Sequence, residues 1–239
     1  MITVACVYKT DLGSRFWPSD VAALRDGIER HLTIPHRFLC LTDDEVRVMG
    51  FGIATIPLVY NLQGWWSKME LFALPGPVLY IDLDTVILGS LDLLVRSIIE
   101  TEHVMVLRDF YSGLPASGVM GWGAFADLSW MLSEFVEDAV LRHYAPSRNG
   151  PGLHCKSGQY IGDQNWLRQA FKRHGVPLVY AQDLANGIYS YKVHVLDRGG
   201  PPDDATLVCF HGRPRINEIM DREPWLKDRV GLHSMAATR

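Results

Sequence analysis

The stretch Val78-Leu79-Tyr80-Ile81-Asp82-Leu83-Asp84-Thr85 decides how the rest of the sequence is interpreted. Its first four residues are apolar or aromatic, as is typical of a central strand that is buried on both faces of a parallel sheet. Two carboxylates follow at spacing i, i+2, which puts Asp82 and Asp84 on one side of an extended chain. Open α/β sheets bind ligands beyond the carboxyl ends of their strands. We therefore predict a binding site at Asp82 and Asp84.

Two clustered carboxylates repel each other unless a cation neutralises them. A hard divalent ion that also binds substrate phosphates is the expected ligand. A second buried run ends in His211-Gly212-Arg213-Pro214-Arg215. An imidazole that joins two carboxylates would favour Mn2+ over Mg2+. Gly212 would allow close backbone approach, and Arg213 or Arg215 would clamp a diphosphate.

Three shorter motifs carry further candidates, each with a structural alternative. In Gly162-Asp163-Gln164-Asn165-Trp166, Asp163 is either a helix N-cap or, with Gln164, a group that faces a reacting sugar. In Trp65-Trp66-Ser67-Lys68, the lysine either reaches phosphate or stays solvated. In Ala116-Ser117-Gly118-Val119-Met120, small residues either lead into a functional strand or form only a tight turn.

Length and composition predict one globular α/β domain over residues 1–239, with a helical tail at 216–239. Apolar runs alternate with amphipathic patterns, which indicates a mostly parallel sheet flanked by helices. The net charge of −4 argues against a nucleic-acid-binding protein. The expected strands are Ile2–Tyr8, Phe38–Leu41, Ile53–Val59, Val78–Ile81, Val104–Leu107, Val119–Trp122, Pro177–Tyr180 and Thr206–Phe210; the expected helices include Ser67–Leu74, Leu91–Ile99, Asp127–Leu141 and Gly162–His174.

The cysteines and the N-terminus predict the compartment. Cys6, Cys40 and Cys209 lie in apolar runs, and the absence of a CxxC pair argues against a zinc or dithiol centre. We expect reduced thiols in a cytoplasmic protein. The sequence shows no signal-peptide pattern and no apolar stretch of about 20 residues, so we expect no integral membrane segment.

The order of these motifs along the chain resembles that of the metal-dependent, nucleotide-sugar glycosyltransferases of the GT-A fold, and most closely glycosyltransferase family 8, the glycogenin-like group. The resemblance runs from Ile2 to about Arg215, and its most specific parts are the Tyr80–Thr85 run and the His211-Gly212 pair. It implies a Rossmann-like GT-A sheet. It also implies transfer of a sugar from a UDP-sugar to a glycan, lipid or protein acceptor, with retention of configuration.

The resemblance also implies a role for each candidate residue. Asp82, Asp84 and His211 would hold Mn2+, or Mg2+, against the donor diphosphate, and Asp163 and Gln164 would lie beside the anomeric carbon. The donor contacts would come from Val7 and Tyr8 at the nucleotide base and from Lys68, Ser117, Gly118, Gly212 and Arg213. Ala116 replaces the family's usual asparagine, and Arg213-Pro214-Arg215 replaces its usual Lys-Pro-Trp. The second departure leaves open which arginine meets the phosphate.

Two other classes fit parts of the sequence. In a haloacid-dehalogenase-like phosphatase, Asp82 would be the nucleophile beside Mg2+. That motif normally follows the first strand, however, and Gly162-Asp163 offers no second acid for the metal. A non-catalytic carbohydrate-binding module would hold Ca2+ at the aspartates and use Trp65, Trp66 and Trp122 as sugar platforms. In the glycosyltransferase, Trp65-Trp66 and the 143–159 loop would contact the acceptor or form a lid.

Overall fold

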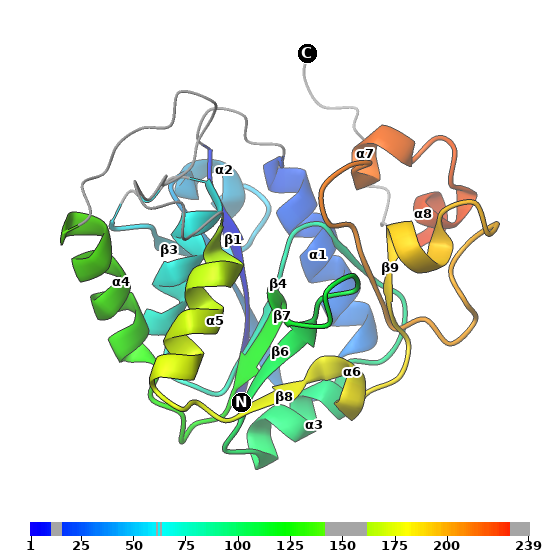
Figure 1. Ribbon diagram of the computed structural model, residues 1–239. Helices are drawn as coiled ribbons and strands as arrows, with labels where there is room; N and C mark the ends of the chain where they lie inside the picture. Colours follow the sequence, from blue (N-terminus) through cyan, green and yellow to red (C-terminus); the bar gives the residue numbers. More distant parts are fainter. Residues whose placement is uncertain (11–15, 61, 63, 142–161, 230–239) are drawn as a thin grey trace.

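A seven-stranded sheet forms the centre of the computed structural model, which describes residues 1–10, 16–60, 62, 64–141 and 162–229 (Figure 1). The strand order is β3-β2-β1-β4-β7-β6-β8, and only β7 runs antiparallel to its neighbours. The mostly parallel GT-A sheet predicted from the sequence is confirmed. Its strands are β1 (Ile2–Tyr8), β2 (His36–Thr42), β3 (Ala54–Pro57), β4 (Val78–Ile81), β6 (Val104–Arg108), β7 (Pro115–Trp122) and β8 (Leu178–Tyr180).

Helices cover both faces of this sheet because successive strand residues point to opposite sides. On one face, β1 residues such as Val4 and Cys6 share a core with α1, α3 and α6. On the other face, Ala5 and Tyr80 share a core with η1, α4 and α5. The bounds are α1 (Pro18–His31), α2 (Glu45–Met49), the 3-10 helix η1 (Gly64–Ala73), α3 (Asp92–Glu100), α4 (Ser129–Leu141), α5 (Asp163–Arg173) and α6 (Ala181–Leu184).

A second, three-stranded sheet lies beside the first and carries the C-terminal part of the chain. Its order is β5-β10-β9, with β10 antiparallel to β5 in the register Cys209 to Thr85. A separate apolar cluster joins this sheet to the last helices. The elements are β5 (Thr85–Ile87), β9 (Ile188–Ser190), the π-helix η2 (Tyr191–Val195), β10 (Leu207–Cys209), α7 (Ile216–Ile219) and α8 (Pro224–Arg229).

Several predicted elements differ from those in the structure. The predicted 67–74 helix is a 3-10 helix that begins three residues earlier, and the predicted 119–122 strand begins at Pro115. Ser117 and Gly118 therefore belong to β7, and the tight-turn alternative is wrong. Cys6, Cys40 and Cys209 are buried free thiols, as expected. Among the described residues, no helix combines the length and apolar character needed to cross a lipid bilayer.

Candidate active site

The buried ammonium group of Lys68 lies at the centre of the candidate site. Its Nζ is 3.0 Å from Oδ1 of Asp82, 3.2 Å from Oδ2 of Asp163 and 3.2 Å from Oγ of Ser117. The Ser117 hydroxyl in turn donates to Oδ2 of Asp163 at 2.6 Å. Four residues singled out in the sequence thus form one connected cluster, although they come from η1, the turn after β4, β7 and α5.

The fold explains this convergence. Tyr80 lies on the sheet face that η1 and α5 cover, and the i, i+2 spacing puts Asp82 on the same face. Antiparallel pairing of β4 with β7 continues past the strand end, where the backbone N–H of Asp82 donates to the carbonyl of Gly118 at 2.8 Å. Gly162 is the N-cap of α5, so Asp163 is not a cap and its carboxylate is free to meet Lys68. The solvated-lysine and N-cap alternatives are therefore wrong.

The site is a buried arrangement of opposite charges. Burial lowers the pKa of Lys68, but the charges of Asp163 and Asp82 outweigh it and hold that pKa above its usual 10.5. The ammonium is therefore permanently charged at neutral pH. Burial, together with the charge of Asp82, raises the pKa of Asp84 from 3.8 to about 7. A cation bound next to Asp84 would stabilise its ionised form and lower this raised pKa.

His211 lies on the chain segment next to the acidic turn. The backbone N–H of Phe210 donates to the carbonyl of Asp84 at 2.7 Å, which extends the pairing of β10 with β5 toward the site. The Nε2 of His211 is 2.6 Å from Oγ of Ser190, and its ring stacks on Phe110 at 5.8 Å between ring centres. Burial and the charge of Lys192 lower the pKa of His211, so its ring is neutral, the form that binds metals.

The predicted metal set fits a divalent cation in its donor chemistry, with two carboxylates and a neutral imidazole. Its three side chains are not gathered into one ligand group, and within the described parts of the chain no three His, Cys, Asp or Glu side chains are so arranged. A carboxylate has about four acceptor positions, so Asp82 keeps capacity for a cation beside its bonds to Tyr80 and Lys68. The three-residue metal site stays a prediction.

The two arginines of the C-terminal motif differ in position. Arg213 is exposed and pairs with Glu218 at 3.6 Å. The guanidinium of Arg215 lies over the ring of Phe16 at 5.3 Å, and its charge offsets part of the rise that burial and Asp82 cause in the pKa of Asp84. Of the two arginines, Arg215 is thus the one whose charge acts on the acidic turn. Gly212, between His211 and Arg213, has φ of +79°, a conformation that side chains disfavour.

Val7 and Tyr8 were predicted to contact the nucleotide base, and Gln164 was predicted to face the sugar. Tyr8 is buried in the core shared with α1, and Val7 is half-buried against the core on the opposite face. Gln164 accepts a hydrogen bond from Arg168 at 3.4 Å and is half-buried at the start of α5. The roles assigned to these three residues stay predictions.

Of the three tryptophans considered as sugar platforms, two lie in the core and one lies on the surface. Trp66 is 2% exposed and stacks on Phe135 at 5.2 Å, and Trp122 is equally buried against Phe72, so neither is a sugar platform. Trp65 is 48% exposed, and its Nε1 lies beside Gly162, 3.7 Å from where a Cβ would stand. The predicted 143–159 loop lies outside the described residues.

Two groups of functional interest were missed in the sequence. The Tyr80 hydroxyl donates to Oδ1 of Asp82, and Ser190 holds the ring of His211. The i, i+2 spacing of Tyr80 and Asp82 could have revealed the first contact. Ser190 lies in a three-residue strand with no pattern that distinguishes it.

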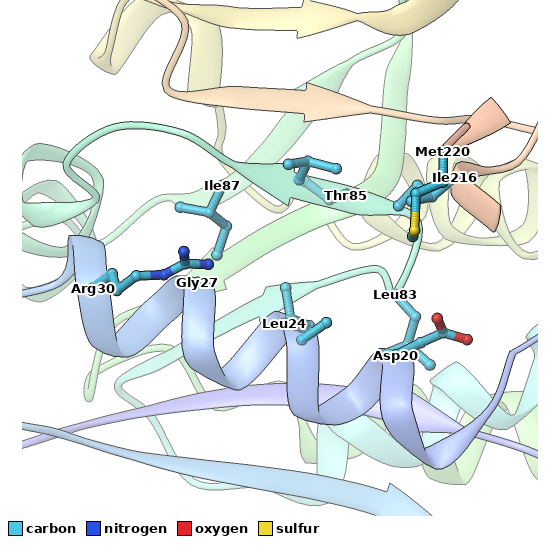
Figure 2. A pocket seen from close by; sticks show the side chains of 11 residues that line it. Asp20, Leu24, Gly27, Arg30, Leu83, Thr85, Ile87, Ile216 and Met220 are labelled. Carbon is cyan, nitrogen blue, oxygen red and sulfur yellow. The ribbon is translucent and has the colours of Figure 1, made fainter. Parts of the chain in front are cut away.

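A pocket lies between α1, β5 and α7 (Figure 2). Leu83 and Thr85 line it, together with Asp20 and Leu24 from α1 and Met220 after α7. Leu83 stands between the two predicted metal ligands in the sequence. Residues 83 and 84 form a turn in which the backbone N–H of Thr85 donates to the carbonyl of Asp82 at 3.1 Å, so the extended chain predicted for Asp82 and Asp84 is wrong. None of the site residues predicted from the sequence lines this pocket, so it is separate from the Lys68 cluster.

Comparison with known proteins identifies the fold. A scan against protein-family models gives no match, and a search of the curated proteins gives none either. The structure of galactosyltransferase LgtC with donor and acceptor sugar analogues superposes with a TM-score of 0.55 at 15% identity, over 97% of this chain and 92% of that one. A glutamine-to-glutamate active-site mutant of LgtC gives 0.55 at 14% identity, over 94% and 95%.

Glycosyltransferase GlyE of Streptococcus pneumoniae TIGR4 matches with a TM-score of 0.49 at 16% identity, over 77% of this chain and 46% of that one. The present chain thus spans about half the length of GlyE. The likeness to LgtC covers nearly the whole of both chains. The protein therefore has the GT-A fold, in the form seen in a galactosyltransferase structure.

Proposed function

We propose that this protein is a glycosyltransferase that moves a sugar from a nucleotide diphosphate sugar, a UDP-sugar, to a carbohydrate-type acceptor with retention of configuration. The observation that carries this proposal is the meeting of Lys68, Asp82, Ser117 and Asp163 at one end of a GT-A sheet. LgtC, which has this fold, was solved with donor and acceptor sugar analogues.

The negative charge of the two aspartates suits the positive charge that would develop on the sugar. Cleavage of the sugar–phosphate bond develops positive charge on the sugar and negative charge on the leaving group. Asp163 and Gln164 would lie beside the sugar; LgtC also has a glutamine in its active site. Lys68 would hold Asp82 and Asp163 in place with a fixed positive charge.

The leaving group would be received on the other side of the acidic turn. Asp82, Asp84 and His211 would hold Mn2+, or Mg2+, which supplies positive charge for the diphosphate. Arg215 is better placed than Arg213 to add to this charge, because its guanidinium acts on Asp84. Gly118 and Gly212 would leave room for the donor, and Val7 and Tyr8 would lie near its base.

The proposed retention rests on the resemblance to glycosyltransferase family 8. The Oδ2 of Asp163 accepts hydrogen bonds from Lys68 and Ser117, so this carboxylate is held in place by its neighbours. Retention without a carboxylate nucleophile would require the acceptor to attack on the face that the diphosphate leaves, and the departing phosphate would take its proton. Proton NMR of the product made from an α-linked donor tests this step: an α-linked product is expected, and a β-linked product would contradict retention.

The competing classes predict different substrates. A phosphatase would release phosphate from simple phosphomonoesters with Mg2+, and the GT-A fold favours turnover of nucleotide sugars instead. A carbohydrate-binding module would bind Ca2+ and glycans without turnover. A panel of UDP-sugars and p-nitrophenyl phosphate, each with Mn2+, Mg2+ and Ca2+, separates the three. Production of UDP only from a UDP-sugar supports the transferase.

A further inference from the structure

Tyr80 contributes a buried hydroxyl to the candidate site. It is the third residue of β4, it is 2% exposed, and its hydroxyl donates to Oδ1 of Asp82. Its ring belongs to the core that η1, α4 and α5 form against the sheet. The ring is thus fixed by packing, and the hydroxyl has a fixed position at the base of the acidic turn.

The same side chain also supports the central cation. The Nζ of Lys68 lies 5.3 Å from the centre of the Tyr80 ring, within the range of a cation–π contact. Lys68 and Tyr80 therefore contact each other and both bind Oδ1 of Asp82. Three side chains form a closed triangle in which each one restricts the other two.

Of the three carboxylate and ammonium groups in the cluster, the side chain of Asp82 is the least restricted by packing. It follows the last strand residue, Ile81, and it is less buried than Lys68 or Asp163. Its backbone is fixed by the hydrogen bond to Gly118, but its side chain is oriented only by groups that bind its oxygens. Lys68 is a flexible four-carbon chain, whereas the Tyr80 ring is rigid. The rigid donor is the one that sets the carboxylate orientation.

We infer that Tyr80 is a positioning residue that acts through its hydroxyl on Asp82. Lys68 contacts both carboxylate oxygens, Oδ1 at 3.0 Å and Oδ2 at 3.2 Å, and the Tyr80 hydroxyl on Oδ1 fixes the plane in which the carboxylate lies. In this role Tyr80 would touch neither the substrate nor a metal ion. This inference rests on the proposed function for its catalytic consequence. The packing of the ring and the hydroxyl contact stand independently of that function.

The test compares Tyr80→Phe with Tyr191→Phe. Tyr191 is a matched control because it is 1% exposed, stacks on Phe210 and donates to Oε1 of Glu223 at 2.6 Å, within the separate core of the second sheet. Each variant removes one tyrosine–carboxylate hydrogen bond and keeps the ring. We expect similar losses of thermal stability in both.

Only Tyr80→Phe is expected to lower kcat, by about 10- to 100-fold, because a hydrogen bond to a charged acceptor is lost at the site. The KM for the acceptor should stay unchanged. Equal kcat values for the two variants would overturn the inference. A further readout is a double-mutant cycle in urea unfolding between Tyr80→Phe and Asp82→Asn, which should be clearly non-additive.

Failure of the proposed function can be distinguished from failure of the positioning role of Tyr80. If the wild-type protein neither binds UDP nor turns over any UDP-sugar, the proposed function is rejected together with the effect on kcat. Non-additivity in the unfolding cycle would still establish that the hydroxyl holds Asp82. Additive effects on unfolding would overturn the positioning role whatever the activity of the protein.

Discussion

The Nζ of Lys68 lies 3.2 Å from Oδ2 of Asp163, and this ion pair joins η1 to α5 beneath the carboxyl end of β4. The pair is buried, and Asp82 shares the same ammonium group at 3.0 Å. One lysine is thus the shared counter-ion of two carboxylates from different parts of the chain. The first prediction depends on this shared charge.

Replacement of Lys68 by methionine should leave Asp82 and Asp163 buried without their countercharge. Loss of one partner from a buried ion pair typically costs about 3–5 kcal/mol of folding free energy. Urea unfolding of Lys68→Met should show a loss of this size. The control Arg47→Met breaks an exposed pair with Asp44 at 3.3 Å and should cost less than about 1 kcal/mol. Similar losses in both variants would contradict the account.

The stability of the metal-free protein should depend on pH through Asp84. Burial and the charge of Asp82 raise the pKa of this group from 3.8 to about 7 in the folded state. The folded protein therefore binds the proton more tightly than the unfolded chain, and its stability falls as pH rises from about 4 to about 7. Melting temperatures in EDTA should show this slope, and Asp84→Asn should make it shallower. An unchanged slope in Asp84→Asn would contradict the assignment.

Much of the fold could be predicted because the strands of the main sheet are continuous apolar runs. The predicted Ile2–Tyr8 strand has those bounds in the structure, and so does Val78–Ile81. β5 and β9 were not predicted, because strands of three residues carry too little pattern to be recognised. Their pairing with β10 is nevertheless what brings the segment before His211 to Asp84.

The sequence motifs identified the candidate site residues, but they did not show which of these residues contact one another. Lys68, Ser117 and Asp163 were all candidates, yet each had an equally ordinary structural reading in the sequence. Only tertiary packing shows that η1 buries Lys68, and the same helix buries Glu70, which accepts the backbone N–H groups of residues 59 and 60. Such contacts depend on which helix covers which face, and local sequence does not specify this.

Ser117 should orient Asp163 through its hydroxyl. The variant Ser117→Ala removes the 2.6 Å hydrogen bond and leaves the lysine contact, so we expect kcat to fall by roughly tenfold and stability by about 1–3 kcal/mol. Steady-state kinetics and urea unfolding measure the two effects. Ser129→Ala is the control, because its hydroxyl bonds Asp127 at 2.6 Å on the exposed surface. A kcat for Ser117→Ala equal to that of the control would count against this role.

Replacement of Trp66 should lower stability, whereas replacement of the adjacent Trp65 should leave stability nearly unchanged. Trp66→Ala removes a buried ring that is stacked on Phe135 and should cost about 3–5 kcal/mol in thermal or urea unfolding. Trp65→Ala should change stability by about 0.5 kcal/mol or less, because surface substitutions usually have small effects. If Trp65 contacts the acceptor, its variant should raise the acceptor KM several-fold at unchanged stability. An unchanged KM would remove Trp65 from the acceptor site.

The most direct test of the central claim is calorimetric titration of UDP into the wild-type protein and Asp84→Asn, each with Mn2+ and with EDTA. The account predicts that wild-type protein binds UDP with Mn2+, that EDTA weakens this binding strongly, and that Asp84→Asn makes the two conditions alike. Wild-type UDP binding that is equal in Mn2+ and EDTA, or absent from both, would contradict it.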